Sequence, residues 1–151
     1  MSAGHLLAIY LTQRKRAALQ RVEEAEAVAG RGLRGDRYFR QEGIGKPDQE
    51  LTLIESETLD WLAREHGITL AANQTRRNLV THSVSLNALV DREFTIGGVL
   101  LRGIMLCEPC GHLQALTVAG IKKALRGHGG LRAEILRGGT LRTGDAVIAD
   151  R

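Results

Sequence analysis

Short apolar runs separated by glycine-rich turns recur along the chain, and they predict a protein built mainly from β-strands. Runs of strand length occur at residues 6–11, 51–54, 94–96, 99–106, 133–137, 140–142 and 146–149. Glycine pairs favour the tight turns that join antiparallel strands. We therefore expect two hairpins, one turning at Gly97-Gly98 and the other at Gly138-Gly139.

Two segments show the spacing of amphipathic helices instead. The first has Ser56 as a candidate N-cap and Gly67 as a stop, and its predicted inner face comprises Leu59, Leu62, Ala63 and His66. The second runs from about 112 to 126, with Gly127 as its end. Gly120 lies inside it and costs roughly 1 kcal/mol of helix stability relative to alanine, so we expect this glycine to pack closely against a neighbour.

The order of these elements predicts the fold class. Strands outnumber helices and do not alternate with them, which favours a β-rich α+β fold: a mostly antiparallel, closed, barrel-like sheet with a few packed helices. At 151 residues the chain is long enough for one core, so we expect a single domain over residues 1–151. The glycine-rich, charged stretch 30–46 is predicted to be a long irregular loop.

Composition narrows the classes of function. The chain has two cysteines, no apolar run of membrane-spanning length and no convincing signal peptide, which is typical of a cytoplasmic protein without membrane association. Its formal net charge of +4 attracts anions, but aromatic residues make up only 3% of the chain and leave little for base stacking. We therefore expect small anionic ligands rather than nucleic acid.

Both cysteines lie in one four-residue stretch, Cys107-Glu108-Pro109-Cys110, between a predicted strand and a predicted helix. Backbone N–H groups and the dipole at the start of a helix favour thiolate over thiol, which points to Cys110 as the more reactive sulfur. A thiolate at such a place can attack an electrophile, carry sulfur or bind a soft metal.

Three alternatives stay open for this cysteine pair. A dithiol redox couple would resemble thioredoxin, although the only other proline, Pro47, lies upstream, where that fold needs a later cis-proline. A structural metal site would combine Cys107, Cys110 and His112 with a fourth ligand chosen from His5, His66, His82 and His128. The third alternative is a pair of small buried apolar residues.

An ordered set of motifs extends over nearly the whole chain, from about residue 6 to 149. The motifs are Gly32-Leu33-Arg34-Gly35-Asp36-Arg37, Thr52-Leu53-Ile54-Glu55, Arg76-Arg77-Asn78, Cys107-Glu108-Pro109-Cys110, Gly129-Gly130-Leu131-Arg132-Ala133 and Gly144-Asp145. Each motif alone is weak, but together they resemble the MOSC domain, the module named after the C-terminus of molybdenum cofactor sulfurase. The similarity is greatest to compact, stand-alone members.

The resemblance implies a β-rich barrel with its functional cysteine in a cleft, and involvement in sulfur delivery or molybdenum cofactor binding. The family's functional cysteine is the second of the pair, so it implies that Cys110 carries a persulfide sulfur or ligates molybdenum, with Cys107 as a candidate resolving thiol. The candidate cofactor-binding residues are Arg76, Arg77, Asn78, Arg132, Gly35, Asp36, Gly129 and Gly130.

Each of these candidate residues also has an alternative role that does not involve a cofactor. The arginines could hold the phosphate of a pterin cofactor through forked donors, or form a solvated edge. The glycines could let the backbone approach a ligand closely, or only permit positive φ in turns. Asp36 could be a buried orienting partner of Arg77 or Arg132, or form an Asx turn.

Two mechanisms follow from the resemblance. A sulfur carrier would take sulfur from a cysteine desulfurase, which is a pyridoxal-phosphate enzyme, and pass it to the molybdenum cofactor or to a molybdoenzyme acceptor. A reductase would hold molybdenum through Cys110 and reduce N-hydroxylated compounds. Its electrons would come from a partner protein, because the sequence shows no flavin, haem or iron-sulfur motif. The sequence shows no pyridoxal-phosphate motif either, so the desulfurase step would belong to another protein.

Two positions depart from the family pattern. Tyr38 stands where many relatives carry histidine, so no general base is carried over to that position. His128 stands where close relatives often carry arginine; it either exchanges protons near pH 7 or is an ordinary solvated loop residue.

Overall fold

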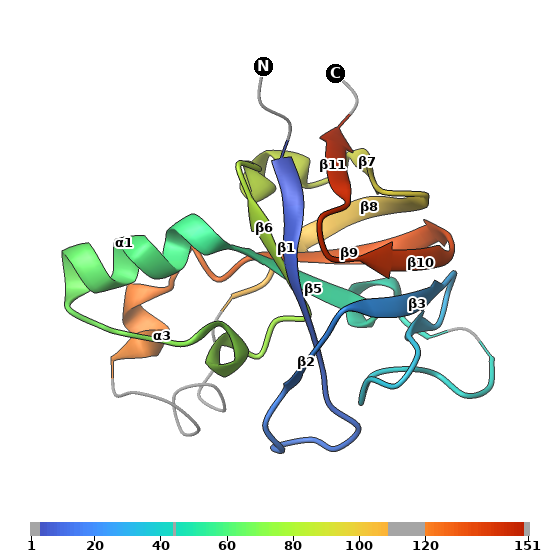
Figure 1. Ribbon diagram of the computed structural model, residues 1–151, viewed down its shortest axis with the longest axis horizontal. Coiled ribbons are helices and arrows are strands. Elements are labelled where there is room, and N and C mark those ends of the chain that lie inside the picture. The colour runs from blue at the N-terminus through green and yellow to red at the C-terminus, as the bar shows by residue number, and fades with distance from the viewer. Residues whose placement is uncertain (1–3, 44, 109–119, 150–151) are drawn as a thin grey trace.

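The computed structural model describes residues 4–43, 45–108 and 120–149, and most of these residues belong to a ring of strands with helices on one side (Figure 1). The strands are β1 (Gly4–Leu11), β2 (Gln20–Val22), β3 (Glu24–Val28), β4 (Gly32–Leu33), β5 (Leu51–Glu55), β6 (Leu79–His82), β7 (Glu93–Ile96), β8 (Val99–Leu106), β9 (Leu131–Arg137), β10 (Gly139–Arg142) and β11 (Ala146–Ala149). The helices are α1 (Ser56–His66) and α3 (Ile121–Ala124), and short 3-10 turns are η1 (Pro47–Gln49), η2 (Ala72–Thr75) and η3 (Leu86–Leu89).

Seven of the strands close into a barrel in the order β11, β7, β8, β9, β5, β6 and β1, and β2 extends the sheet beside β1. The ring closes where β1 pairs with β11, with Gly4 opposite Val147 and His5 opposite Ala146. Within the ring the strands pair antiparallel, except for β5 and β6. The mostly antiparallel, β-rich barrel predicted from the sequence is confirmed.

The barrel is filled by apolar side chains that the strands direct inward. Leu53 of β5, Ile96 of β7 and Leu131 of β9 are fully buried in one cluster that also takes in residues of β1 and β8. Each large apolar side chain buried in this way contributes roughly 1.5–3 kcal/mol. This interior supplies the rigid frame from whose strand ends the loops described below extend.

The two glycine pairs have different outcomes. Ile96 pairs with Val99, so Gly97-Gly98 forms the predicted two-residue hairpin turn between β7 and β8. The second predicted hairpin is wrong, because β9 pairs with β5 and β8 while β10 pairs with β3. At Gly138 the chain leaves the barrel for a separate sheet of β10, β3 and β4; a Cβ there would lie 2.5 Å from the Ala27 carbonyl oxygen.

Helix α1 joins β5 to β6 and so makes a strand-helix-strand crossover that the sequence analysis did not expect. It ends as predicted at Gly67, whose φ is 64° and whose N–H donates to the Leu62 carbonyl. The predicted cap is wrong, because Glu55 occupies the N-cap position and makes no side-chain capping bond. Leu62 and Leu59 pack toward α3 as expected, whereas Ala63 and His66 of the predicted inner face are exposed.

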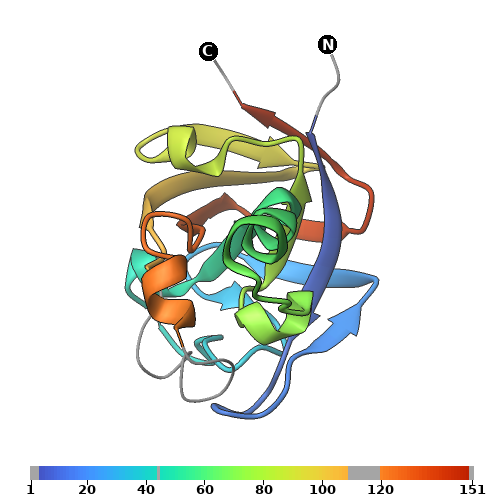
Figure 2. The same ribbon diagram turned by 90° about the vertical axis from the view of Figure 1, so that its left-hand side faces the viewer.

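The second predicted helix is shorter than expected in the part that the structure describes. Gly120 is the N-cap of α3 with a φ of 87°, so it begins this helix rather than lying inside it. A Cβ at Gly120 would meet no heavy atom within 4 Å, so the expected close packing is wrong as well. Ile121 and Leu125 are buried beneath α1, which lies beside α3 in both views (Figures 1 and 2). No described helix is long and apolar enough to cross a membrane.

The backbone of Gly130 crosses β5 at close range immediately before β9 begins. Its φ is 109°, and a Cβ at this position would collide with the carbonyl oxygen of Leu53. The close crossing sets the register of β9 against β5, in which Arg132 lies opposite Thr52. It also places the Gly130 carbonyl 2.7 Å from the backbone nitrogen of Cys107, which donates a hydrogen bond to it.

We predict that Gly130→Ala destabilises the protein by about 2–6 kcal/mol, since a strained φ costs about 1–3 kcal/mol and overpacking adds a similar amount. Gly144→Ala is the matched control, because its φ is 97° and its Cβ would meet no heavy atom within 4 Å. It should lose only the backbone cost, about 1–3 kcal/mol. Urea unfolding measures the free energy of unfolding of both variants. Equal losses of stability would contradict a destabilising contact between a Cβ at position 130 and the Leu53 carbonyl.

Candidate functional site

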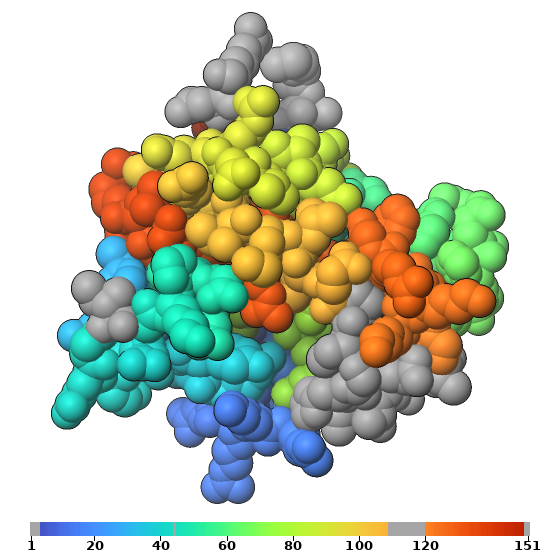
Figure 3. Space-filling model, turned by 180° about the vertical axis from the view of Figure 1, so that it is seen from behind, coloured from blue at the N-terminus to red at the C-terminus, as the bar shows by residue number. Residues whose placement is uncertain are grey.

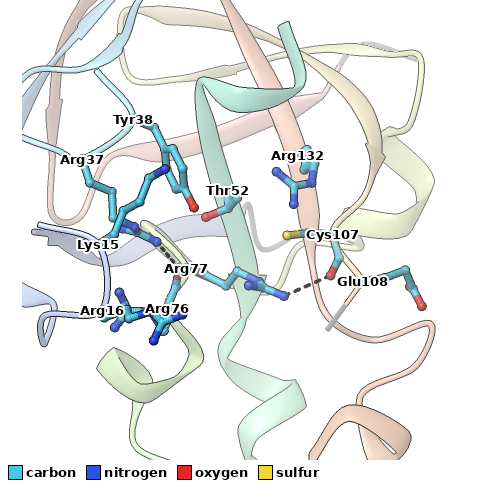
Figure 4. Close-up of a pocket in the computed structure, with 10 residues that line it drawn as sticks. All are labelled: Lys15, Arg16, Arg37, Tyr38, Thr52, Arg76, Arg77, Cys107, Glu108 and Arg132. Atoms are coloured by element: carbon cyan, nitrogen blue, oxygen red, sulfur yellow. Dashed lines mark hydrogen bonds between the residues drawn. The ribbon is translucent and has the colours of Figure 1, made fainter. Parts of the chain in front are cut away.

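A pocket opens on the barrel where the ends of β5, β6, β8 and β9 meet the loop between β1 and β2. It encloses about 380 Å³, within the range of roughly 300–1,000 Å³ typical of small-molecule sites. The lining residues are Lys15, Arg16, Arg37, Tyr38, Thr52, Arg76, Arg77, Cys107, Glu108 and Arg132 (Figure 4). In Figure 3 the surface is hollowed in this region, above the projecting β1–β2 loop.

The pocket lining is strongly cationic. Six of its ten residues are lysine or arginine, and Glu108 is its acid. The Glu108 carboxylate accepts hydrogen bonds from the Gly127 backbone nitrogen at 3.1 and 3.2 Å. Buried Asp36 offsets one further charge through its 3.2 Å contact with Arg37. The positive charge that remains attracts anionic ligands from solution.

Arg77 ties together the backbones of two loops at the pocket floor. Its Nε donates to the Gly129 carbonyl at 2.8 Å and its Nη2 to the Cys107 carbonyl at 3.2 Å (Figure 4). The side chain is buried, so these charge-assisted bonds lie in a low dielectric and are strong. The main structural role of Arg77 is therefore to hold the backbone at Cys107 in position.

Arg76 sits at the opposite end of the pocket in a left-handed conformation with a φ of 62°. Its Nη1 donates to the Ala17 carbonyl at 2.8 Å, whereas its Nη2 is buried without a hydrogen-bond partner in the described residues. Burial, together with the neighbouring Arg37 charge, lowers the pKa of Arg76 from its ordinary value. A buried N–H without a partner costs about 1–3 kcal/mol, and an anion at this end of the pocket would relieve that cost.

Asp36 does not orient Arg77 or Arg132, so that expectation is wrong. Its Oδ1 accepts from the Thr12 backbone nitrogen and from Arg37 Nη1, both at 3.2 Å, and Oδ2 lies 3.5 Å from the Tyr38 nitrogen. The last contact has the pattern of the alternative Asx turn. Asp36 thus fixes Arg37, whose guanidinium lies 4.6 Å from the Tyr38 ring centroid.

The remaining cofactor-binding candidates do not line this pocket. Asn78 is buried, and its side chain bonds Thr52 and the Tyr10 carbonyl. Gly35, with a φ of 91°, borders a separate hollow beside β2. Gly129 and Gly130 are buried, and their carbonyls accept bonds from Arg77 and Cys107. The glycine positions described here serve turns and close backbone packing.

Cys107 lines the pocket with only 1% of its surface exposed. Its partner Cys110, together with His112, lies outside the described residues. Within the described residues no group of three or more histidine, cysteine or acidic side chains is arranged to hold a metal.

The four histidines offered as a fourth metal ligand do not line the Cys107 pocket. The rings of His5 and His82 lie 5.4 Å apart, and those of His66 and His128 lie 4.8 and 4.4 Å from the ring of Trp61.

Sequence reasoning did not assign six of the lining residues to the site: Lys15, Arg16, Arg37, Tyr38, Thr52 and Glu108. Thr52 and Arg37 belong to quoted motifs but received no role. The run Arg14-Lys15-Arg16 follows β1 directly, and a basic run in a tight turn at a strand end was the signal available.

Comparisons with known proteins agree with this architecture. The chain is similar to the YuaD protein of Bacillus subtilis, with a TM-score of 0.78, 15% identity and coverage of 97% of this chain and 94% of that one. YiiM of Geobacillus stearothermophilus gives 0.77 and 14%, over 98% of this chain and 75% of that one. YiiM of Escherichia coli gives 0.71 and 17%, over 97% and 69%. At these identities the likeness shows a shared fold.

Sequence comparison supplies the family. A search among curated proteins finds no match. The family model described as the MOSC domain matches residues 40–148, which is well over half of the chain and includes the pocket residues from Thr52 to Arg132. The chain belongs to the MOSC domain family.

Proposed function

We propose that this chain binds the molybdenum cofactor in the cationic pocket and that Cys110 supplies the sulfur atom that works there. MOSC domains are associated in general with molybdenum cofactor binding and sulfur transfer. The observation that supports cofactor binding is the excess of positive charge around a pocket that contains Cys107. Neither a dithiol redox couple nor a structural metal site needs such a lining.

The residues present fit an anionic pterin cofactor. The unpartnered Nη2 of Arg76 lies at the end of the pocket that also carries Lys15, Arg16 and Arg37. Guanidinium groups bind phosphate oxygens through paired N–H donors, so the three arginines would hold the phosphate of the cofactor in this way, and the Lys15 ammonium would add a point charge beside them. Thr52 and Arg77 would bind polar groups of the pterin.

We propose the Cys110 sulfur as the ligand to molybdenum, because the family's functional cysteine is the second of the pair. It follows Cys107 by three residues, and three peptide units span at most about 11 Å, so the covalent chain keeps Cys110 within reach of the pocket. Arg77 contributes by fixing the carbonyl of Cys107, from which the segment that carries Cys110 departs.

When bound, the cofactor would supply two-electron oxygen-atom-transfer chemistry. In the reductase version of the proposal an N-hydroxylated compound takes up two electrons and two protons, and its N–O bond breaks to give N–H and water. The electrons come from a partner electron-transfer protein. The chain's own residues would bind and orient the anionic groups, and Arg77 holds the backbone carbonyl of Cys107.

A sulfur carrier is the second candidate, and the observation that favours it is the pairing of Cys110 with a second thiol, Cys107, in the pocket wall. The Cys110 thiolate would attack the outer sulfur of a cysteine desulfurase persulfide. A new S–S bond forms on Cys110, the desulfurase thiolate leaves, and no net oxidation occurs. The acceptor, a molybdenum cofactor or molybdoenzyme, would then take the outer sulfur.

We predict that Cys110→Ser abolishes molybdenum-pterin retention and sulfur loading while the protein stays folded. Native mass spectrometry after incubation with molybdenum cofactor, or with a cysteine desulfurase and cysteine, reads out both adducts. Cys107→Ser is the matched control and should keep the adduct. If Cys110→Ser kept the adduct and Cys107→Ser lost it, Cys107 would be the functional cysteine instead. A one-sulfur adduct without a molybdenum-pterin adduct on the unmodified protein would favour the sulfur carrier.

We predict that Arg76→Gln weakens binding of inorganic phosphate by about 10–150-fold, because a hydrogen bond to a charged partner contributes about 1.5–3 kcal/mol. Titration calorimetry measures the affinity, with thermal unfolding as the check on folding. Arg102→Gln is the control, since this exposed arginine of β8 does not line the pocket. Unchanged phosphate affinity in Arg76→Gln would contradict the proposal that this end of the pocket binds the phosphate.

A further inference from the structure

A smaller chamber adjoins the main pocket and shares three of its residues. It encloses about 140 Å³ and is lined by Tyr38, Gln49, Leu51, Thr52, Asn78 and Arg132. Tyr38, Thr52 and Arg132 also line the main pocket, so they form the boundary between the two spaces. In Figure 4 the guanidinium of Arg132 and the sulfur of Cys107 point toward the same space beside Thr52.

Arg132 gives the chamber its charge. It is the charged residue among the described side chains that line this space. Its guanidinium donates from Nη1 to the Asp48 carbonyl at 3.0 Å, which holds the group in place without neutralising it. The ion pairs of the described residues do not include Arg132. A half-buried, fixed and uncompensated guanidinium favours a negatively charged ligand.

Two other polar side chains in the chamber can donate hydrogen bonds to a ligand. Thr52 and Asn78 satisfy each other through the Asn78 Oδ1 and Thr52 Oγ1 bonds. The Gln49 amide and the Tyr38 hydroxyl make no side-chain hydrogen bond in the described residues, so both remain able to donate. Together with Arg132 they match a group that only accepts hydrogen bonds, such as a carboxylate or another oxyanion.

The volume limits the size of the ligand. A cavity of about 150 Å³ holds one benzene molecule, so this chamber has room for about six non-hydrogen atoms. We propose that the chamber is the substrate subsite, and that it takes a small monoanion whose carboxylate or oxyanion binds Arg132, Gln49 and Tyr38. This inference rests on the proposed function, because the main pocket would hold the cofactor beside it.

The chamber restricts the substrates available to the proposed reductase. Arg132 makes this space positive, so protonated amidines and amines bind there less favourably than anions. Among N-hydroxylated compounds of this size, acids are therefore the preferred class. Arg132 is then a specificity-determining residue, distinct from the arginines at the phosphate end.

Butyrate and butyramide test the inference, because they have nearly the same shape and differ in charge. Binding to the cofactor-free protein is followed by amide chemical shifts of Gln49 and Thr52 in two-dimensional NMR. We expect butyrate to bind at least about tenfold more tightly than butyramide, and Arg132→Gln to lose about tenfold or more of that affinity. Arg102→Gln removes an exposed arginine that lines neither space, so it is the control and should change butyrate affinity by less than about twofold.

Equal binding of butyrate and butyramide, or unchanged butyrate affinity in Arg132→Gln, would overturn the substrate subsite. Arg132→Lys keeps the charge and should retain part of the butyrate affinity if the chamber remains folded. Comparing this titration with cofactor retention by the unmodified protein separates the chamber from the proposed function. Arg132-dependent butyrate binding in an unmodified protein that retains no molybdenum cofactor would support the chamber and reject cofactor binding.

Discussion

The hydrogen bonds that Arg77 donates to the Gly129 and Cys107 carbonyls hold the site together. One guanidinium, fixed at the start of β6, joins the loop after α3 to the end of β8. The Cys107 N–H closes the same connection by donating to the Gly130 carbonyl. Because the three segments are far apart in sequence, the pocket depends on a buried charged group that donates to two backbone oxygens.

This arrangement also explains how the fold tolerates a dense cluster of cations. Like charges destabilise one another, and burial adds a desolvation cost. Backbone carbonyls offset part of this: Arg77, Arg76, Arg37 and Arg132 each donate to at least one. Carbonyl dipoles orient the guanidinium groups but leave their net charge in place, so the pocket remains available to an anion.

Much of the barrel could be predicted from the sequence because many of its strands are short apolar runs bounded by glycine-containing turns. The run at 99–106 matches β8, and the run at 146–149 matches β11. By contrast, β3 was missed because alanines fill its inward positions, Ala25 and Ala27, and alanine signals a strand weakly. The wrong hairpin at Gly138-Gly139 arose because a glycine pair also permits a close crossing between sheets.

The site was predicted less completely than the fold. The arginines of the Arg76-Arg77-Asn78 motif were found, but their separate tasks depend on partners distant in sequence, such as Ala17 and Gly129, which no local pattern encodes. Lys15 and Arg16 were missed because a basic run in a turn resembles any solvated surface. The smaller chamber could not be predicted, because its residues Thr52 and Arg132 are brought together only by the pairing of β5 with β9.

The closure of the barrel by β1 and β11 has a consequence for biosynthesis. The first strand must wait for a partner that lies about 140 residues later, so at 5–20 residues per second its edge stays open for roughly 7–28 s on the ribosome. During that time Gly4 and His5 present unpaired backbone groups, which can pair with other chains. This edge of β1 is therefore open to aggregation until β11 has been synthesised.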